Sequence, residues 1–247
     1  MSEAASKTDH AAQGEDTDDE WSTAVICVTA CFSLALVHFA STASVFQQIY
    51  PNDAARGDMY WLLKSKVWWA GWIVVGFIVI PAISMALLQG HRLRECNLSP
   101  RGFFDHLWIY LMLIGVAIPV VILAAQTAAF SSYYPMYSLA GRSWFDLLCW
   151  EGLYSAQFIA IEFFFRGFLL GGLARRFGRS SIAVCAMPYM MIHFLKPWPE
   201  VAASVLAGFV LGGLAWKTKS IWGGVTVHCA VAYSMDLMAL GHKGQLP

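Results

Sequence analysis

The sequence predicts an all-α protein, a polytopic bundle of about seven transmembrane helices. Composition gives the first reason, because 58% of the 247 residues are hydrophobic and only 13% are charged. A soluble domain is about a quarter charged and about half apolar at most. The second reason is length, since apolar runs that approach the ~20 residues needed to cross a bilayer recur along the chain. Together with a mean hydropathy of +0.55, these features exclude an ordinary soluble enzyme.

Residues 1–20 differ from the rest of the chain. They contain seven acidic residues and a single lysine, Lys7. Such a segment buries too little apolar surface to fold alone, so we expect a disordered acidic tail. It lacks the basic start of a signal peptide. The remainder, 21–247, is predicted to be one transmembrane domain.

Apolar runs of helical length then follow one another, and we expect a span at each of 21–42, 67–88, 107–130, 145–174, 182–195, 201–216 and 221–240. The fourth run is long enough to tilt, and the fifth is short for a full crossing. Nine Lys and Arg residues lie on the N-terminal side of these spans and six on the other side. The positive-inside rule therefore favours a cytoplasmic N-terminus by a small margin. The short chain and short loops favour a bacterial inner (plasma) membrane.

Charge and cysteine usage exclude other classes of protein. The formal net charge is zero, so the chain has no basic face for nucleic acid. The six cysteines are scattered and form no C-x-x-C pair, which fits small apolar residues in a membrane. The partner that the composition implies is the lipid bilayer.

Among the ionisable residues inside or at the end of the predicted spans, four stand out: Glu162, Arg166, His193 and His228. Each such side chain costs about 2.5–3.5 kcal/mol at a helix centre. Glu162 and Arg166 are four residues apart and share a helix face, so a simple ion pair that lets the span insert is one interpretation. A histidine alone is more often packed than functional. Because the four residues occupy three separate spans, a shared polar pocket is favoured.

Further polar residues are accessory candidates. Lys196 and Glu200 flank a turn that contains two prolines, and they lie either in a solvated loop or at the mouth of the site. Asp236 either faces the same cavity as His228 or lies near the membrane surface. Asp146 is expected to be structural.

Several known intramembrane chemistries are absent from the sequence. It has no H-E-x-x-H string of a zinc protease. It also has no G-x-S-G string, the Gly-flanked Ser of a serine protease. Its single Gly-Asp pair, Gly57-Asp58, is in a loop rather than a span. A carboxylate combined with histidines remains.

Three short motifs carry a family resemblance. Residues 161–166 read I-E-F-F-F-R, residues 189–193 read Y-M-M-I-H, and residues 228–232 read H-C-A-V-A. In order and spacing they resemble the CPBP intramembrane proteases (also called the Abi family), which include the type II CAAX prenyl proteases and bacteriocin-processing enzymes. The family pattern is E-E-x-x-x-R, F-x-x-x-H and H-x-x-x-N on three helices. The resemblance covers about residues 145–240, which would form the catalytic core.

The resemblance implies an intramembrane endopeptidase of metallo or glutamic type. Glu162 would be the general base for a water molecule, and Arg166 would orient it. His193 and His228 would hold the water and the developing oxyanion, or would bind a metal together with Glu162. Zinc would suit these ligands, but the same residues could act without metal. The substrate would be a CAAX-type tail, a leader peptide or a C-terminal sorting segment.

Three departures from the family pattern leave an alternative open. Ile161 replaces the first Glu, Tyr189 replaces the Phe, and Ala232 replaces the Asn. Either Glu162 keeps the base role, or Glu200 or Asp236 substitutes for the missing carboxylate. The alternative is a catalytically inactive relative that binds peptide as an immunity or scaffold factor. A transporter would also use buried charges, but the sequence lacks the internal repeats expected of one.

Overall fold

The computed structural model describes residues 2–51, 57–88 and 93–247. Within these residues every regular element is helical, apart from one isolated bridge between Leu98 and Ser220. In chain order the helices are α1 (Ser2–Ala40), α2 (Ala43–Ile49), α4 (Trp61–Val74), the π-helical η1 (Val75–Val79), α5 (Ile80–Leu87), η2 (Leu93–Glu95), α6 (Pro100–Phe104), α7 (Leu107–Ala124), α8 (Ala128–Tyr133), η3 (Ala140–Arg142), α9 (Trp144–Glu162), the π-helical η4 (Phe163–Leu169), α10 (Leu170–Phe177), η5 (Gly178–Ser180), α11 (Ser181–Met191), α12 (Trp198–Thr218) and α13 (Trp222–His242).

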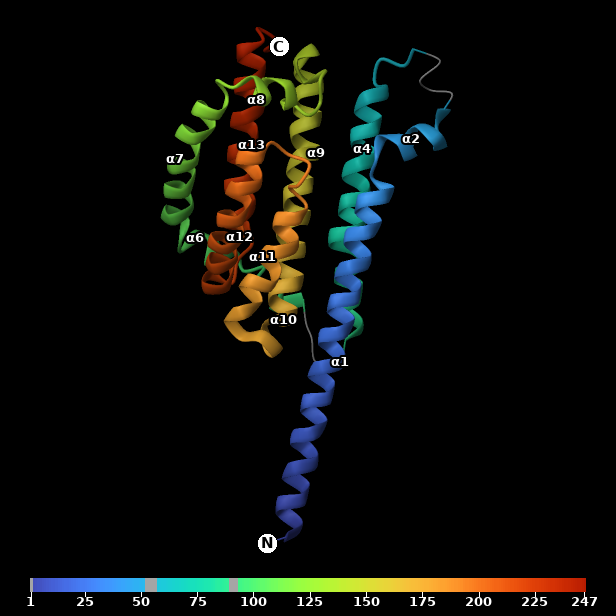
Figure 1. Cartoon of the computed structure of the whole chain (residues 1–247), viewed down its shortest axis with the longest axis vertical. Coiled ribbons are helices and arrows are strands. Elements are labelled where there is room, and N and C mark those ends of the chain that lie inside the picture. The colour runs from blue at the N-terminus through green and yellow to red at the C-terminus, as the bar shows by residue number, and fades with distance from the viewer. Residues whose placement is uncertain (1, 52–56, 89–92) are drawn as a thin grey trace.

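The predicted transmembrane bundle is confirmed. Within the described residues, six helical stretches are long and apolar enough to cross a membrane. One of them, Trp144–Met191, contains two passages, because α9, η4 and α10 run one way and the short α11 returns. The chain therefore passes along the bundle about seven times, and its termini lie at opposite ends (Figure 1). The protein is an integral, multi-pass membrane protein.

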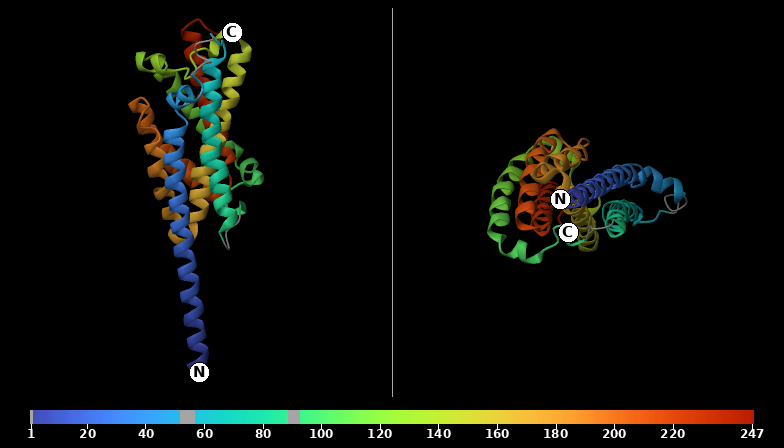
Figure 2. Two further views of the ribbon diagram at one scale, coloured as in Figure 1. Left: turned by 90° about the vertical axis from the view of Figure 1, so that its right-hand side faces the viewer. Right: turned by 90° about the horizontal axis from the view of Figure 1, so that it is seen from below.

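The acidic segment differs from its predicted form. α1 is one continuous helix from Ser2 to Ala40, so residues 2–20 are helical where we expected a disordered tail. The segment contains good helix formers such as Ala, Glu and Gln, and it extends a helix that the apolar part has already nucleated. Figure 2 shows this part of α1 protruding beyond the bundle. That the segment is separate from the transmembrane domain remains a prediction.

Two predicted spans end earlier than expected. In the run 107–130, α7 stops at Ala124 and α8 begins after Thr127, whose hydroxyl caps the new helix by accepting from the Phe130 amide at 3.3 Å. In the run 182–195, α11 stops at Met191. His193 therefore lies just beyond the helix, in the turn that leads to Pro197, rather than within it.

The stretch α9–η4–α10 forms the centre of the bundle. α4 packs against one side of α9 and α13 against another, and α7 lies outside α13 (Figures 1 and 2). The aromatic residues of η4 are buried, and the ring of Phe164 stacks on Phe77 of η1 with centroids 4.5 Å apart. Close packing on several sides explains why this stretch tolerates charged residues that a lipid-facing helix would expose.

α9 begins at a buried polar cluster. Asp146 accepts hydrogen bonds from the Arg142 guanidinium at 2.7 and 2.9 Å and from the Tyr137 hydroxyl at 2.7 Å. The Ser143 hydroxyl caps the helix by accepting from the Asp146 amide at 3.1 Å. This is the structural role that we expected for Asp146.

Candidate functional site

Glu162 and Arg166 form a buried ion pair at the centre of the bundle. Glu162 is the last residue of α9, and Arg166 lies in η4, where the helix widens into π geometry. Nη1 of Arg166 is 3.2 Å from Oε1 of Glu162, and the two side chains are 2% and 1% exposed. Single-turn π segments often occur at functional sites. The pair predicted from the four-residue spacing is therefore present.

His228 of α13 joins this pair. Its Nδ1 lies 3.1 Å from Oε1 of Glu162 and 3.1 Å from the carbonyl oxygen of Gly224. Both neighbours are acceptors, so Nδ1 carries a hydrogen, and in the tautomer with that single ring hydrogen Nε2 is an acceptor. The close approach requires glycine at 224, because a Cβ there would lie 2.1 Å from Oε2 of Glu162.

Tyr189 of α11 completes the cluster. Its hydroxyl lies 2.9 Å from Nε2 of His228, to which it donates a hydrogen bond. The guanidinium carbon of Arg166 lies 3.9 Å from the centre of the Tyr189 ring. On the other side, Phe158 stacks on the His228 ring at 5.2 Å with the planes 6° apart. His228 is therefore fixed at both nitrogens and on one face.

His193 reaches the cluster only through Tyr189. Its Nδ1 donates to the Tyr189 carbonyl oxygen at 2.9 Å, and the two rings are 4.9 Å apart. Among the described residues, Tyr189 is the hydrogen-bond partner of the His193 ring. The backbone bond leaves Nε2 of His193 for other ligands. Of the four residues predicted to be catalytic, three are in direct contact and the fourth is one residue removed.

The arrangement does not fit the predicted metal ligands. Within the described part of the chain, no group of three or more His, Cys, Asp or Glu is arranged to hold a metal ion. Oε1 of Glu162 already faces Arg166 and His228, and Nε2 of His228 faces the Tyr189 hydroxyl. A zinc ion bound through these atoms would displace contacts within the cluster. The mechanism proposed below uses no metal.

Glu200 and Lys196 form a separate pair at the start of α12. Nζ of Lys196 lies 3.1 Å from Oε2 of Glu200, and Tyr134 donates its hydroxyl to Oε1 at 2.6 Å. Burial raises the pKa of Tyr134 far above its usual value, so this hydroxyl stays protonated and donates. Both oxygens of Glu200 are thus occupied by the protein, in a contact between α12 and the segment after α8.

Asp236 lies fully buried on α13, on the face that also carries His228 two turns earlier. The indole Nε1 of Trp150 donates to its Oδ2 at 2.5 Å, while Oδ1 has no hydrogen-bond partner among the described residues. Asp236 is therefore enclosed by protein. Its hydrogen bond joins α13 to α9, away from the Glu162 carboxylate.

Two of the three substituted motif positions, Ile161 and Ala232, face packed hydrocarbon. Ile161 is 6% exposed and belongs to the central cluster around Phe164 and Phe168. Ala232 is 3% exposed and packs in a second cluster with Trp150 and Tyr154.

Three contacts of the site were not predicted. Asn97 is buried and donates its Nδ2 to the Arg166 carbonyl oxygen at 2.7 Å, which satisfies a backbone group in the π segment. Gly224 admits the Glu162 carboxylate, and Phe158 supports the His228 ring. A glycine pair at 223–224 inside an apolar helix was a usable signal for a close approach, because glycine there weakens a helix unless packing needs it. Nothing near Asn97 in the sequence indicates its role.

Comparison with known protein families identifies the region that contains this site. Residues 143–234 match a family model described as type II CAAX prenyl endopeptidase Rce1-like. The match covers less than half of the chain and includes all three motifs, so the predicted resemblance is confirmed over these residues. It supports a role as a membrane protease. No curated protein and no solved structure matches the chain.

Proposed function

We propose that this protein, whose residues 143–234 carry the Rce1-like region, is an intramembrane endopeptidase that hydrolyses a membrane-associated peptide. The proposal depends on one observation, the contact of Glu162 with His228 between two helices inside the bundle. A carboxylate beside an imidazole is a common arrangement for activating water. The proposed substrates are those that the family resemblance implies, a CAAX-type tail, a leader peptide or a C-terminal sorting segment.

In the proposed mechanism His228 is the general base, and Glu162 orients it. Glu162 is 1% exposed and faces Arg166, so a water molecule has little access to its carboxylate. When the Tyr189 hydroxyl turns away from it, Nε2 of His228 can accept a proton from water as the water oxygen adds to the peptide carbonyl carbon. The imidazolium that forms is stabilised by Glu162 at Nδ1. Nε2 then returns the proton to the leaving nitrogen as the carbon–nitrogen bond breaks.

Tyr189 and His193 are proposed to stabilise the oxyanion. The Tyr189 hydroxyl lies beside Nε2 of His228 and can turn to a negative oxygen that develops there. This hydroxyl would take the part of the Asn that Ala232 replaces. His193 has Nε2 left for the substrate, because its Nδ1 is bound to backbone. Arg166 stays with Glu162 and keeps it ionised.

The test is cleavage by the purified full-length protein in lipid nanodiscs. The probes are a farnesylated C-terminal tail, an amphipathic leader peptide and a C-terminal sorting segment, with products identified by mass spectrometry. His228→Gln is expected to lower the rate by about 100-fold or more, the usual contribution of a general base. His38→Gln, in α1, serves as the matched control and is expected to cleave normally. Equal rates for both variants would refute the mechanism.

The second candidate is a catalytically silent peptide-binding protein. The burial of Ile161 and Ala232 in hydrocarbon favours it, because both motif positions have lost their polar groups. This candidate predicts binding without cleavage in wild type, and it predicts that His228→Gln binds peptide as wild type does. Equilibrium binding measured beside cleavage separates the two candidates.

We propose that the N-terminus is cytoplasmic and that the membrane is a bacterial inner membrane. The segments around Arg101, Arg175, Arg176, Arg179, Lys217 and Lys219 lie at the N-terminal end of the bundle, in support of the positive-inside count. Labelling of single cysteines introduced at 179 and 243 by a membrane-impermeant reagent tests this orientation. Residue 243 is expected to react from outside intact cells, and residue 179 is not.

A further inference from the structure

A cavity lies at the N-terminal end of the bundle, apart from the Glu162–His228 cluster. It has a volume of about 330 Å³ and is lined by Glu95, Asn97, Leu170, Gly171, Ala174, Arg175, Trp216 and Lys219. Pockets for small ligands start at roughly 300 Å³, so the cavity suits a compact group. We call it the Lys219 pocket. The proposed peptidase mechanism uses none of its side chains.

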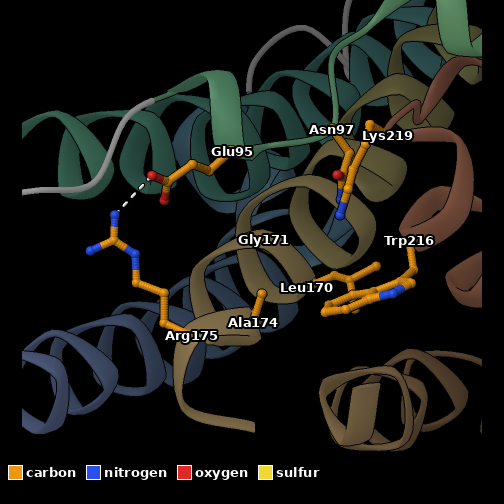
Figure 3. A pocket seen from close by; sticks show the side chains of 8 residues that line it. All are labelled: Glu95, Asn97, Leu170, Gly171, Ala174, Arg175, Trp216 and Lys219. Atoms are coloured by element: carbon orange, nitrogen blue, oxygen red, sulfur yellow. Dashed lines mark hydrogen bonds and ion pairs between the residues drawn. The ribbon is translucent and has the colours of Figure 1, made fainter. Parts of the chain in front are cut away.

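The pocket is built by close packing between α10 and the segment 93–97. A Cβ at Gly171 would lie 2.2 Å from the Glu95 carbonyl oxygen, so glycine is needed for this approach. Figure 3 shows Leu170, Gly171 and Ala174 along one side, with the Trp216 indole opposite Asn97. The Glu95–Arg175 ion pair, at 2.9 Å, closes one edge.

Backbone hydrogen bonds fix the main chain of Lys219. It has a left-handed conformation with φ of 54°, just after α12. Its amide donates to Ala215 at 2.9 Å, and its carbonyl accepts from the Ser99 amide at 3.0 Å. The ammonium lies 4.5 Å from the centre of the Trp216 ring. The backbone of Lys219 is thereby fixed and its exposed ammonium lies at the rim of the cavity, whose charged lining residues sum to one net positive charge.

The position of the pocket across the membrane indicates which anions can reach it. α12 has 21 residues and is therefore ~32 Å long, close to the ~30 Å thickness of a hydrocarbon core. Lys219 directly follows α12, so it lies at the level of the lipid phosphates. Trp216, one turn earlier, has the position typical of interfacial tryptophans. Basic pockets between membrane helices can bind anionic headgroups.

We propose that the Lys219 pocket binds the phosphate headgroup of an anionic phospholipid from the leaflet on the N-terminal side. The phosphate pairs with the Lys219 ammonium, and the glycerol backbone rests against Trp216 and Leu170, while Arg175 stays paired with Glu95 at the other edge. Asn97 lines the same cavity and holds the Arg166 carbonyl, so an occupant also touches the segment that carries the buried ion pair. The proposal does not depend on peptidase activity.

The experiment measures the thermal midpoint of the full-length protein in detergent as short-chain phosphatidylglycerol is added. Phosphatidylcholine and inorganic phosphate at equal ionic strength are the comparison ligands. Phosphatidylglycerol is expected to stabilise wild type in a saturable way, and phosphatidylcholine is not. If inorganic phosphate stabilises the protein equally well, the pocket is a free-anion site and the lipid proposal is wrong.

Matched variants locate the effect. Lys219→Asn removes the charge with a residue that tolerates the left-handed conformation, and it is expected to weaken phosphatidylglycerol binding about fivefold. Lys217→Asn removes an equal charge from an exposed position two residues away and is expected to bind as wild type does. Lys219→Arg is expected to keep binding. If Lys219→Asn binds as tightly as wild type, or if Lys217→Asn is weakened as much, the pocket is not the binding site.

Discussion

Nδ1 of His228 lies 3.1 Å from Oε1 of Glu162, and this contact joins α13 to α9 at the most buried part of the bundle. The same oxygen faces the Arg166 guanidinium at 3.2 Å. The Glu162 carboxylate thus contacts both Arg166 and His228. These contacts hold the helices together and also serve the proposed chemistry. Experiments on the site must therefore separate the loss of stability from the loss of activity.

Glu162→Gln is expected to impair both properties. The substitution leaves Arg166 buried beside a neutral amide, and breaking a buried pair costs about 3 kcal/mol or more. The thermal midpoint in detergent should fall, and cleavage should be lost because His228 is no longer held by a carboxylate. Differential scanning fluorimetry and the peptide assay measure the two effects.

The double variant Glu162→Gln/Arg166→Met is the control for the first prediction. It removes both charges, so most of the lost stability should return, because uncharged replacements of a buried pair are often neutral. Activity should not return. Recovery of cleavage in the double variant would show that Glu162 serves only to neutralise Arg166.

The helical fold could be predicted from the sequence because each helix is determined by the residues of its own segment. Apolar runs of bilayer length require helices wherever they occur, and the polar breaks between them set the connections. The same is true of the Glu162–Arg166 pair, whose four-residue spacing places both side chains on one helix face. The convergence with His228 followed from the energetic cost of isolated polar groups in lipid.

The remaining site geometry depends on contacts that have no periodic signal. Tyr189 fills the space between Arg166 and His228, which keeps His193 one residue away from the carboxylate. Asn97 reaches the Arg166 carbonyl from a distant segment. These positions are decided by how helices pack side by side. A single sequence specifies which faces are apolar, but it does not specify which residues meet across them.

Gly224→Ala is predicted to disable the site while the bundle stays folded. The added methyl would lie 2.1 Å from Oε2 of Glu162, so the carboxylate must move away from His228. We expect a loss of cleavage of about 100-fold, since small displacements of positioned groups cost that much. Gly213→Ala in α12 is the control, because the added carbon would have no described atom within 4 Å outside its chain neighbours and its own helix backbone. Equal activity of the two variants would contradict the required close approach.

Tyr189→Phe tests the proposed oxyanion donor. The variant keeps the ring that faces Arg166 and removes only the hydroxyl at 2.9 Å from His228. We expect kcat to fall by about 100-fold with little change in KM, as for other single oxyanion donors. Stability should change by only about 1 kcal/mol, the net value of a hydrogen bond. The family pattern has Phe at this position. If kcat of Tyr189→Phe is unchanged or increased, the Tyr189 hydroxyl has no role in catalysis.

Trp150→Phe tests whether Asp236 is structural. The indole donates to Oδ2 of the fully buried Asp236 at 2.5 Å, and its removal leaves that carboxylate without this partner. We expect a destabilisation of about 2 kcal/mol from the unsatisfied group. Cleavage per folded molecule should be unchanged, because the contact lies apart from Glu162. A selective loss of kcat in Trp150→Phe would instead favour Asp236 as the substitute base.

Chelation distinguishes a metal mechanism from the one proposed. Zinc binding would need Glu162, His193 and His228 to turn toward one point, whereas Glu162 faces Arg166 and His228 faces Tyr189. Breaking the buried pair to free a ligand would cost about 3 kcal/mol, which a metal site would have to recover. We therefore expect cleavage by protein dialysed against a strong chelator to match that of untreated protein. Loss of activity that zinc alone restores would overturn this expectation and would require the three side chains to rearrange around the ion.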